Sequence, residues 1–242
     1  LPQQAVRVLE ASATGRVRIA TSYSVREALY GIAPPEGMIT AAVEDERAKH
    51  LLLSALEVSE PAALKLVRVT VREGGTSAIF GDIVAYSDDA ETNLFIVLDG
   101  DHRPKSPIPS DGSLPQGLRE LKDLISEATR GPNSSGPSLR ISNAEKATRY
   151  LQFLRDRVMY LPGETPESVV WNEAKVSEIV DRVLPAAVLE KKDYKERLRA
   201  AADLAPGIDD ETIYKQLVAH RLRDGTDTCS QLLALASRIR NS

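Results

Sequence analysis

The stretch FIVLDGDHRP, residues 95–104, indicates the fold class of this chain. Together with Leu94, its first four residues form an apolar run that no polar residue interrupts. Such a run predicts a strand covered on both faces, as in a parallel sheet that lies between helices. The run ends at Asp99-Gly100-Asp101, so two carboxylates are expected at the carboxyl end of the strand, where open α/β sheets bind their ligands.

Asp99 and Asp101 are two residues apart, so in an extended chain they share one face. Two carboxylates held this close repel each other unless one is protonated or a cation neutralises them. Mg²⁺ is a hard cation that prefers carboxylate oxygens, and Gly100 adds no side chain to the space between them. An Asp-rich turn explains the same residues, because Asp-Gly is also a favourable turn pair. Both interpretations stay open on this stretch alone.

Composition and charge restrict the class of protein. The 242 residues are 42% hydrophobic, carry a net charge of −4 and include one cysteine, Cys229. This predicts a globular chain without a disulfide or a cysteine zinc cluster. The sequence lacks a signal peptide and a run of about 20 apolar residues, so we expect a cytoplasmic protein with no membrane partner. It also lacks an initiator Met, which suggests a fragment or a processed chain. The acidic balance argues against non-specific coating of nucleic acid, but not against a local site where cations offset the acids.

The rest of the chain alternates between strand and helix patterns, which is typical of a parallel sheet. No GxxxxGK[ST] or GxGxxG loop follows any strand, so a nucleotide-binding loop is not expected. The expected strands cover 38–45, 64–71 and 94–101, with helices over 46–58 and 76–87, then 118–129 and 142–156. A strand, a turn and a helix follow over 158–171, with a helix start at Thr165-Pro166-Glu167. From 174 onward four helical segments are broken near Pro185, Pro206-Gly207 and Gly225. Before residue 38 we expect two short strands within 5–20, a short helix from Ser24 and a break at 34–37.

A second acidic pair, Glu44 and Asp45, follows the first strand of this α/β unit. If that strand lies beside the strand that ends at Asp99, then Glu44, Asp99 and Asp101 converge at one edge of the sheet. Three carboxylates there suit Mg²⁺ or Mn²⁺. Asp45 is either a further ligand or the cap of the helix that follows it.

These motifs, in this order, resemble the Toprim domain. The resemblance lies in Val43-Glu44-Asp45 after the first strand, Gly74-Gly75 after the second and Leu98-Asp99-Gly100-Asp101 after the third. It covers roughly residues 38–104 and the strand and helix that follow. Many Toprim proteins have a glycine where this chain has Asp45. The implied fold is α/β, a Toprim-like parallel sheet flanked by helices and followed by an α-helical C-terminal domain.

The helical C-terminal part and the stretch YLPGETPESVVW resemble the C-terminal nuclease region of the overcoming-lysogenization-defect (OLD) family, which includes ATPase-coupled defence proteins. The resemblance implies three parts: residues 1–33 as the tail of an upstream ATPase region, 34–172 as a Toprim catalytic domain and 173–242 as a helical domain. The implied partners are DNA and the upstream ATPase region. A homodimer through a part outside this sequence is also compatible with the resemblance.

The implied activity is that of a Mg²⁺- or Mn²⁺-dependent DNA endonuclease in which two cations roughly 4 Å apart support phosphodiester hydrolysis. Ca²⁺ could bind such a site without supporting catalysis. Glu44, Asp99 and Asp101 are the expected catalytic and metal-binding residues. Asp45, Glu164 and Glu167 are candidates for further metal ligands, although Glu164 also suits a turn and Glu167 the first turn of a helix.

The positive charge that such a reaction needs could come from the C-terminal helices. They offer Lys191, Lys192, Lys195 and Lys215, and the sequence does not distinguish among them. His102 could contact a phosphate, although a loop histidine without such a role is the commoner case.

Two other classes of function fit the same acids. One is a phospho-transfer module, although a receiver domain needs a lysine at a later strand end and VMYLPG offers none. A dehalogenase-like phosphatase has its DxD after the first strand, whereas here it follows the third. The other class is a non-catalytic, Toprim-like interaction domain.

Overall fold

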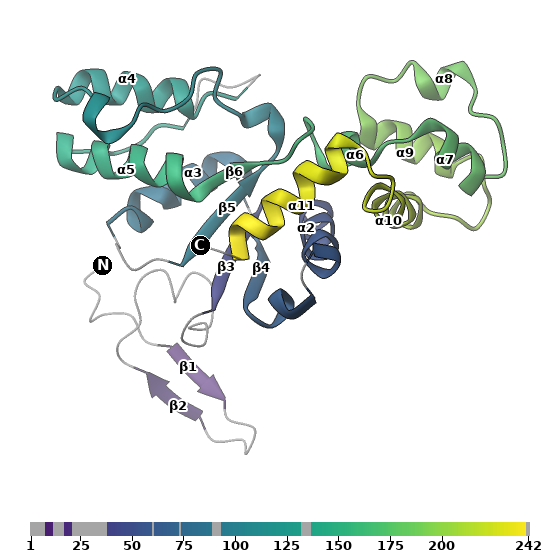
Figure 1. Cartoon of the computed structure of the whole chain (residues 1–242), viewed down its shortest axis with the longest axis horizontal. Helices are drawn as coiled ribbons and strands as arrows, with labels where there is room; N and C mark the ends of the chain where they lie inside the picture. The colour runs from purple at the N-terminus through teal and green to yellow at the C-terminus, as the bar shows by residue number, and fades with distance from the viewer. Residues whose placement is uncertain are drawn as a thin grey trace.

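The computed structural model describes residues 8–11, 17–20, 38–59, 61–72, 74–88, 93–131 and 137–240. Its centre is a four-stranded, all-parallel sheet in the order β4-β3-β5-β6 (Figure 1). The strands are β3 (Ile39–Val43), β4 (Val67–Val71), β5 (Leu94–Leu98) and β6 (Val158–Tyr160). Helices cover both faces of this sheet, so the predicted α/β class and the parallel sheet are confirmed.

The central strand β5 explains why its sequence does not alternate. All five of its residues are buried, and successive side chains enter two different cores. Leu94, Ile96 and Leu98 pack with the helices α3 (Gly75–Tyr86), α4 (Leu118–Ala128) and α5 (Ala144–Arg157). Phe95 and Val97 face the other core, which holds α2 (Glu46–Ser59) and α11 (Asp227–Arg240).

The C-terminal part is helical, as predicted, but its segments differ from the prediction. Before α11 the chain forms α6 (Pro166–Val170), α7 (Glu173–Ile179), α8 (Ala186–Leu189), α9 (Tyr194–Ala202) and α10 (Asp210–Arg221). The expected single helical segment between Pro185 and Pro206 is therefore wrong, because α8 and α9 are separate helices. Asp193 starts α9 as its N-cap, since its carboxylate accepts a hydrogen bond from the Lys195 backbone N–H at 2.7 Å.

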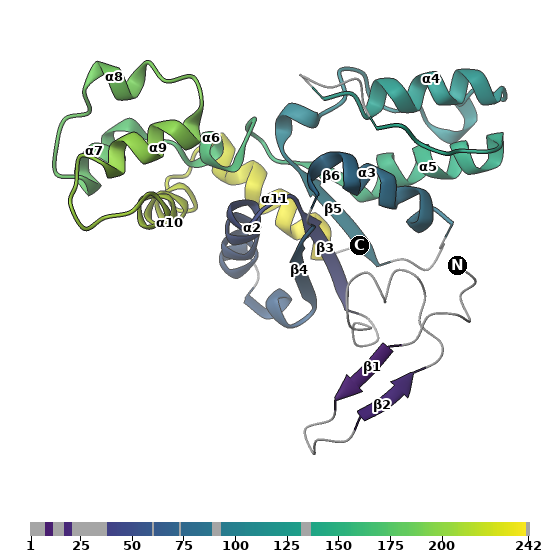
Figure 2. The ribbon, with the colours of Figure 1, turned by 180° about the vertical axis from the view of Figure 1, so that it is seen from behind.

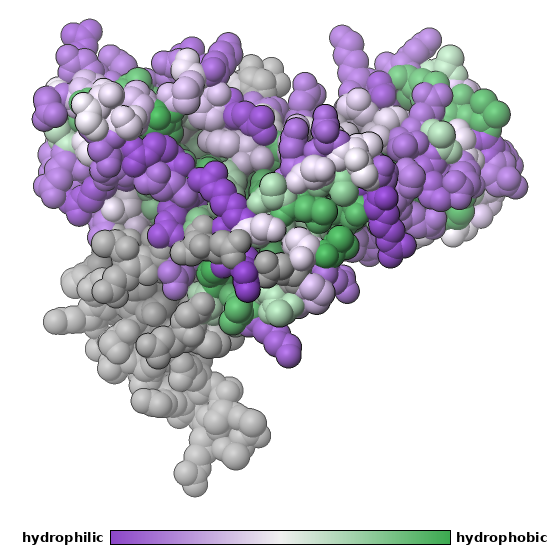
Figure 3. Space-filling view, viewed as in Figure 1, coloured by the Kyte–Doolittle hydropathy of each residue, from purple (hydrophilic) through white to green (hydrophobic). Residues whose placement is uncertain are grey.

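Helix α11 returns from this helical group to the sheet. It packs against α2 and β3, far from its neighbours in sequence. Figures 1 and 2 show the result from both sides: α3, α4 and α5 lie on one flank of the sheet, α7 to α10 lie on the other, and α11 lies between them next to α2. On the face seen in Figure 3, hydrophobic side chains gather over α11 and α2.

Several smaller predictions can also be compared with the structure. The two short strands near the start are confirmed as the antiparallel pair β1 (Val8–Ala11) and β2 (Val17–Ala20). Strand β4 begins three residues later than expected, because Pro61–Lys65 form the short 3₁₀ helix η2. The helix expected from Ser24 and the break at 34–37 lie outside the described residues. Within the described ranges, no helix has both the length and the apolar character needed to cross a membrane.

Candidate functional site

The site begins where β3 and β5 end side by side. These parallel strands pair with Val43 opposite Val97, so the residues that follow them reach the same edge of the sheet. Glu44 Oε1 accepts a hydrogen bond of 3.0 Å from the backbone N–H of Asp99. The predicted adjacency of the two acidic motifs is therefore confirmed for this pair.

Asp99 is the strand-end acid that has a buried carboxylate oxygen without a hydrogen-bond partner. Its Oδ1 is buried and makes no hydrogen bond. Burial, together with the negative charges of Glu44, Asp45 and Asp101, raises the pKa of Asp99 to about 8, against the opposing charge of Lys195. All four predicted acids at the two strand ends are thus close enough to interact electrostatically. A proton or a cation at Asp99 would relieve their repulsion.

Thr76 and His102 hold the carboxylate of Glu44 in place. The Thr76 hydroxyl donates to Glu44 Oε2 at 2.5 Å and lies 2.9 Å from His102 Nε2. Since the hydroxyl has one hydrogen and gives it to Glu44, His102 Nε2 must be the donor in the second contact. His102 Nδ1 is buried and without a partner, and Nε2 lies 3.6 Å from Asp101 Oδ1. His102 therefore reaches Glu44 through Thr76 and approaches Asp101 directly.

Sequence reasoning did not select Thr76. The signal that could have found it is its position directly after Gly74-Gly75, at the start of α3.

Asp45 has one carboxylate oxygen in each of two roles. Its Oδ1 accepts from the Ala48 backbone N–H at 2.8 Å, so Asp45 caps the first turn of α2. Its Oδ2 accepts from Lys195 Nζ at 3.2 Å. The capping role that the sequence left open is shown.

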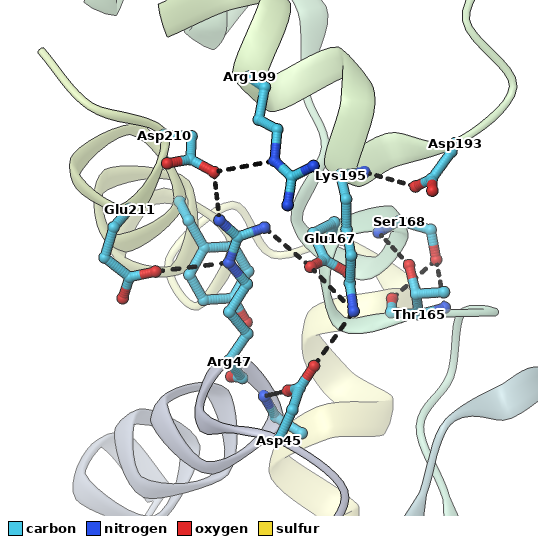
Figure 4. Close-up of polar contacts among 12 residues, drawn as sticks. Asp45, Arg47, Thr165, Glu167, Ser168, Asp193, Lys195, Arg199, Asp210 and Glu211 are labelled. Atoms are coloured by element: carbon cyan, nitrogen blue, oxygen red, sulfur yellow. Dashed lines mark hydrogen bonds and ion pairs between the residues drawn. The ribbon is translucent and has the colours of Figure 1, made fainter. Parts of the chain in front are cut away.

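Lys195 links the strand-end acids to Glu167 (Figure 4). Its ammonium group lies 3.2 Å from Asp45 Oδ2 and 3.8 Å from Glu167 Oε1. Burial would lower the pKa of Lys195, but the charges of Glu167 and Asp45 outweigh it and raise that pKa, so the side chain is positively charged.

Lys195 stands apart from the other three candidate lysines. The ion pairs of Lys191 and Lys215 are with Glu196 at 3.7 Å and Glu211 at 3.4 Å, outside this group of acids. No ion pair of Lys192 joins it to any part of the chain that the structure describes. Of these four lysines, Lys195 is the one whose ammonium group lies next to a strand-end acid, and the sequence alone did not distinguish it.

Glu167 is fully buried and is held by an arginine. Its Oε1 accepts from Arg47 Nη1 at 2.9 Å, while its Oε2 is buried without a partner. Arg47 also donates to Asp210 Oδ2 at 2.8 Å, and these hydrogen bonds raise its pKa although burial opposes them. Glu167 therefore not only lies in the first turn of α6 but also joins α6 to Arg47 of α2. The predicted helix start is confirmed, because Thr165 and Ser168 form a capping box there.

Gly100 lets the β6–α6 loop approach the acids. Its N–H donates to Gly163 O at 3.1 Å, and the Asp101 N–H donates to Glu164 O at 3.3 Å. A Cβ atom on Gly100 would lie 2.1 Å from Gly163 O, which leaves no room for any other residue. The glycine between the two aspartates is thus explained by close packing. Glu164 reaches Asp101 through its backbone, and its side chain is exposed.

The donor set suits a hard cation, although the side chains are not arranged around one. No group of three His, Cys, Asp or Glu side chains in the described ranges forms a metal site as it stands. Both oxygens of Glu44 accept hydrogen bonds, but each keeps a second lone pair. The free Oδ1 of Asp99 is the atom best placed to gain from a cation. Carboxylate oxygens without sulfur or paired imidazole ligands favour Mg²⁺, Mn²⁺ or Ca²⁺.

Comparisons with models of protein families, with curated proteins and with solved structures found no match. The function therefore has to be argued from the residues of the site themselves.

Proposed function

We propose that this chain is a divalent-cation-dependent DNA nuclease of the Toprim type. One observation carries the proposal: the buried Oδ1 of Asp99 has no partner, in a group of carboxylates that Glu44, Asp45 and Asp101 complete. A buried carboxylate oxygen without a partner is costly unless a proton or a cation satisfies it, and a divalent cation would at the same time neutralise the neighbouring carboxylates.

Asp99, Asp101 and Glu44 would hold the first cation. A second, held by Glu167 and Asp45, would require the Lys195 ammonium to move aside, because it lies 3.2 Å from Asp45 Oδ2 and 3.8 Å from Glu167 Oε1. Such cations polarise the phosphoryl oxygen and activate the attacking water. The unpartnered Oε2 of Glu167 supports its inclusion. Glu164 would take part in the site only through its backbone oxygen, which accepts a hydrogen bond from Asp101, and not as a side-chain ligand.

The remaining residues of the site would orient the carboxylate of Glu44 and neutralise negative charge on the phosphate. Thr76 and His102 fix the carboxylate of Glu44, so its direction is set before any cation arrives. Lys195 brings a positive charge to the edge of the site, where it can stabilise charge on a phosphate in the transition state. Because Lys195 belongs to α9, the helical C-terminal part takes part in the site.

The Toprim resemblance is supported by the order of the motifs on neighbouring parallel strands and by the glycine pair at the start of α3. Membership of the OLD family, an upstream ATPase region, a homodimer and a cytoplasmic location stay predictions. So does the division at residues 33/34 and 172/173.

The test is cleavage of supercoiled plasmid with Mg²⁺ or Mn²⁺, beside an EDTA control and Asp99→Ala. A matched control is Glu57→Ala, which removes an exposed acid of α2 outside the site. We expect nicking or linearisation that is lost with EDTA and in Asp99→Ala but kept in Glu57→Ala. Cleavage by Asp99→Ala at the wild-type rate, or no cleavage with either cation, would refute the proposal.

A phospho-transfer site is the second candidate, and one observation favours it. Receiver-type sites need a lysine near the acids, and α9 supplies Lys195 although no strand end does. Incubation with acetyl phosphate and Mg²⁺, followed by intact mass measurement, tests this candidate. The gain of one phosphoryl group in the wild type, absent from Asp99→Ala, would favour phospho-transfer over hydrolysis.

A further inference from the structure

A polar pocket of about 580 Å³ opens directly beside the strand-end acids. One wall is the loop after β5, which contributes Asp101, Arg103 and Lys105. The other wall is the C-terminal end of α4, where the lining residues are Asp123, Ser126, Glu127, Arg130 and Gly131. Since Asp101 belongs to both the pocket and the candidate site, whatever fills the pocket is continuous with the group bound at the acids.

Most charged side chains of this pocket form no ion pair with other described residues. Lys105 and Arg130 are exposed, and neither forms an ion pair with another part of the chain that the structure describes. The same holds for Asp123 and Glu127, which lie one helical turn apart on α4. Arg103 is different, because its guanidinium donates to Leu161 O at 2.9 Å and is thereby fixed in direction.

We propose that this pocket binds a single unpaired nucleotide next to the phosphodiester bond that is cleaved. The inference rests on the proposed nuclease function and specifies its substrate as DNA that is single-stranded at this point. Its phosphate would lie against Arg103, Lys105 and Arg130, because such cations supply most of the affinity for nucleic-acid backbones.

The acids on α4 decide the orientation of the nucleotide. Asp123 and Glu127 would repel a phosphate, but carboxylates accept hydrogen bonds from the amino groups of bases. The base would therefore face α4, with Ser126 as a further donor or acceptor. A volume of this size lies within the ~300–1,000 Å³ range of pockets for small ligands. A pocket on this scale can accept one nucleotide, whereas a duplex needs an extended groove.

The test is the binding of a fluorescent single-stranded oligonucleotide and of a hairpin duplex of the same length to the full chain, with Ca²⁺ as the only divalent cation. The variant is Lys105→Gln with Arg130→Gln. The matched control is Arg119→Gln with Lys122→Gln, which removes the same charge from exposed positions of α4 that do not line the pocket.

We expect the pocket variant to raise the Kd for the single strand about tenfold or more, and the control to leave it near the wild-type value. Because both side chains face the same phosphate, their loss should also lower the slope of log Kd against log salt by about 0.7, the value for one phosphate of a single strand. The Kd for the duplex should change much less.

Equal weakening by both double variants would overturn the inference, because it would show only a general effect of charge. Equal weakening for duplex and single strand, or no binding by the wild type, would overturn it as well. These outcomes are separate from the plasmid assay. If the wild type cleaves plasmid but the pocket variant binds the single strand as tightly as the wild type, the pocket proposal alone is refuted. If the pocket variant binds the single strand more weakly but the wild type does not cleave plasmid, the nuclease proposal alone is refuted.

Discussion

Replacing Asp99 by Asn tests the central feature of the site, which is a partly buried carboxylate whose Oδ1 has no partner. In the cation-free protein, the pKa of Asp99 is about 8, against 3.8 for an unperturbed Asp side chain. The folded state therefore binds this proton more tightly than the unfolded state does. The stability from this group is fully present below pH 3.8, and it is lost as the pH rises toward 8. Asn has a similar shape but no charge, so the variant should not show this loss.

The magnitude follows from the two pKa values. Between pH 5 and pH 7, Asp99 is ionised when unfolded and mostly protonated when folded. Each pH unit in this window lowers the free energy of unfolding by about 1.36 kcal/mol, so two units lower it by about 2.7 kcal/mol. Urea unfolding with EDTA at pH 5, 6 and 7 measures this. The stability of Asp99→Asn relative to the wild type should rise by about 2.7 kcal/mol across the range.

A control separates this effect from the titration of other acids. Glu57→Gln removes an exposed carboxylate of α2, and its stability relative to the wild type should stay constant over the same range. A constant difference for Asp99→Asn as well would show that Asp99 is already ionised at pH 5. The reasoning that makes this carboxylate dependent on a proton or a cation would then be wrong.

Three further substitutions address the surroundings of Asp99. Gly100→Ala places a Cβ atom 2.1 Å from a backbone oxygen of the β6–α6 loop, so we expect a loss of about 1–3 kcal/mol in urea unfolding; wild-type stability would contradict the close packing. Lys195→Gln should slow plasmid cleavage about 10²–10³-fold, as for the loss of one group that stabilises transition-state charge. The exposed neighbour Lys192→Gln should cleave normally, and equal rates for both variants would remove Lys195 from the mechanism. Arg47→Met leaves the buried Glu167 without its closest partner, so we expect about 3–5 kcal/mol of destabilisation, and an unchanged Tm would argue against this ion pair.

Much of the fold was predictable because it is encoded locally. The five buried residues of β5, the helical spacing in α2 and the capping box of α6 each depend on a few neighbouring residues. The errors occurred where weak local signals compete. Pro61 and its neighbours form a 3₁₀ helix in place of the first residues of β4, and Asp193 starts a new helix within a continuous helical pattern.

The site was predictable only in part. Parallel neighbouring strands bring Glu44 beside Asp99, and this could be inferred from the order of the motifs. The contact between Asp45 and Lys195 joins positions 150 residues apart, and no local pattern marks which lysine will make it. Glu167 likewise resembles an ordinary first-turn acid in the sequence, and only the packing of α2 against α6 brings Arg47 to it.

The return of α11 to the sheet has a consequence for biosynthesis. Asp227, the first residue of α11, follows the end of α2 at Ser59 by 168 residues, yet the two helices pack together in one core. At ~5–20 residues per second, a ribosome needs roughly 8 to 34 seconds to translate that interval. Strands β4, β5 and β6 are translated within this interval. From the end of β6 at Tyr160 until α11 arrives, one face of the complete sheet is incompletely covered, and exposed apolar surface of this kind attracts chaperones and promotes aggregation. The nascent chain is therefore expected to stay protease-sensitive until α11 has left the exit tunnel, and slow codons placed before Asp227 should lower the soluble yield.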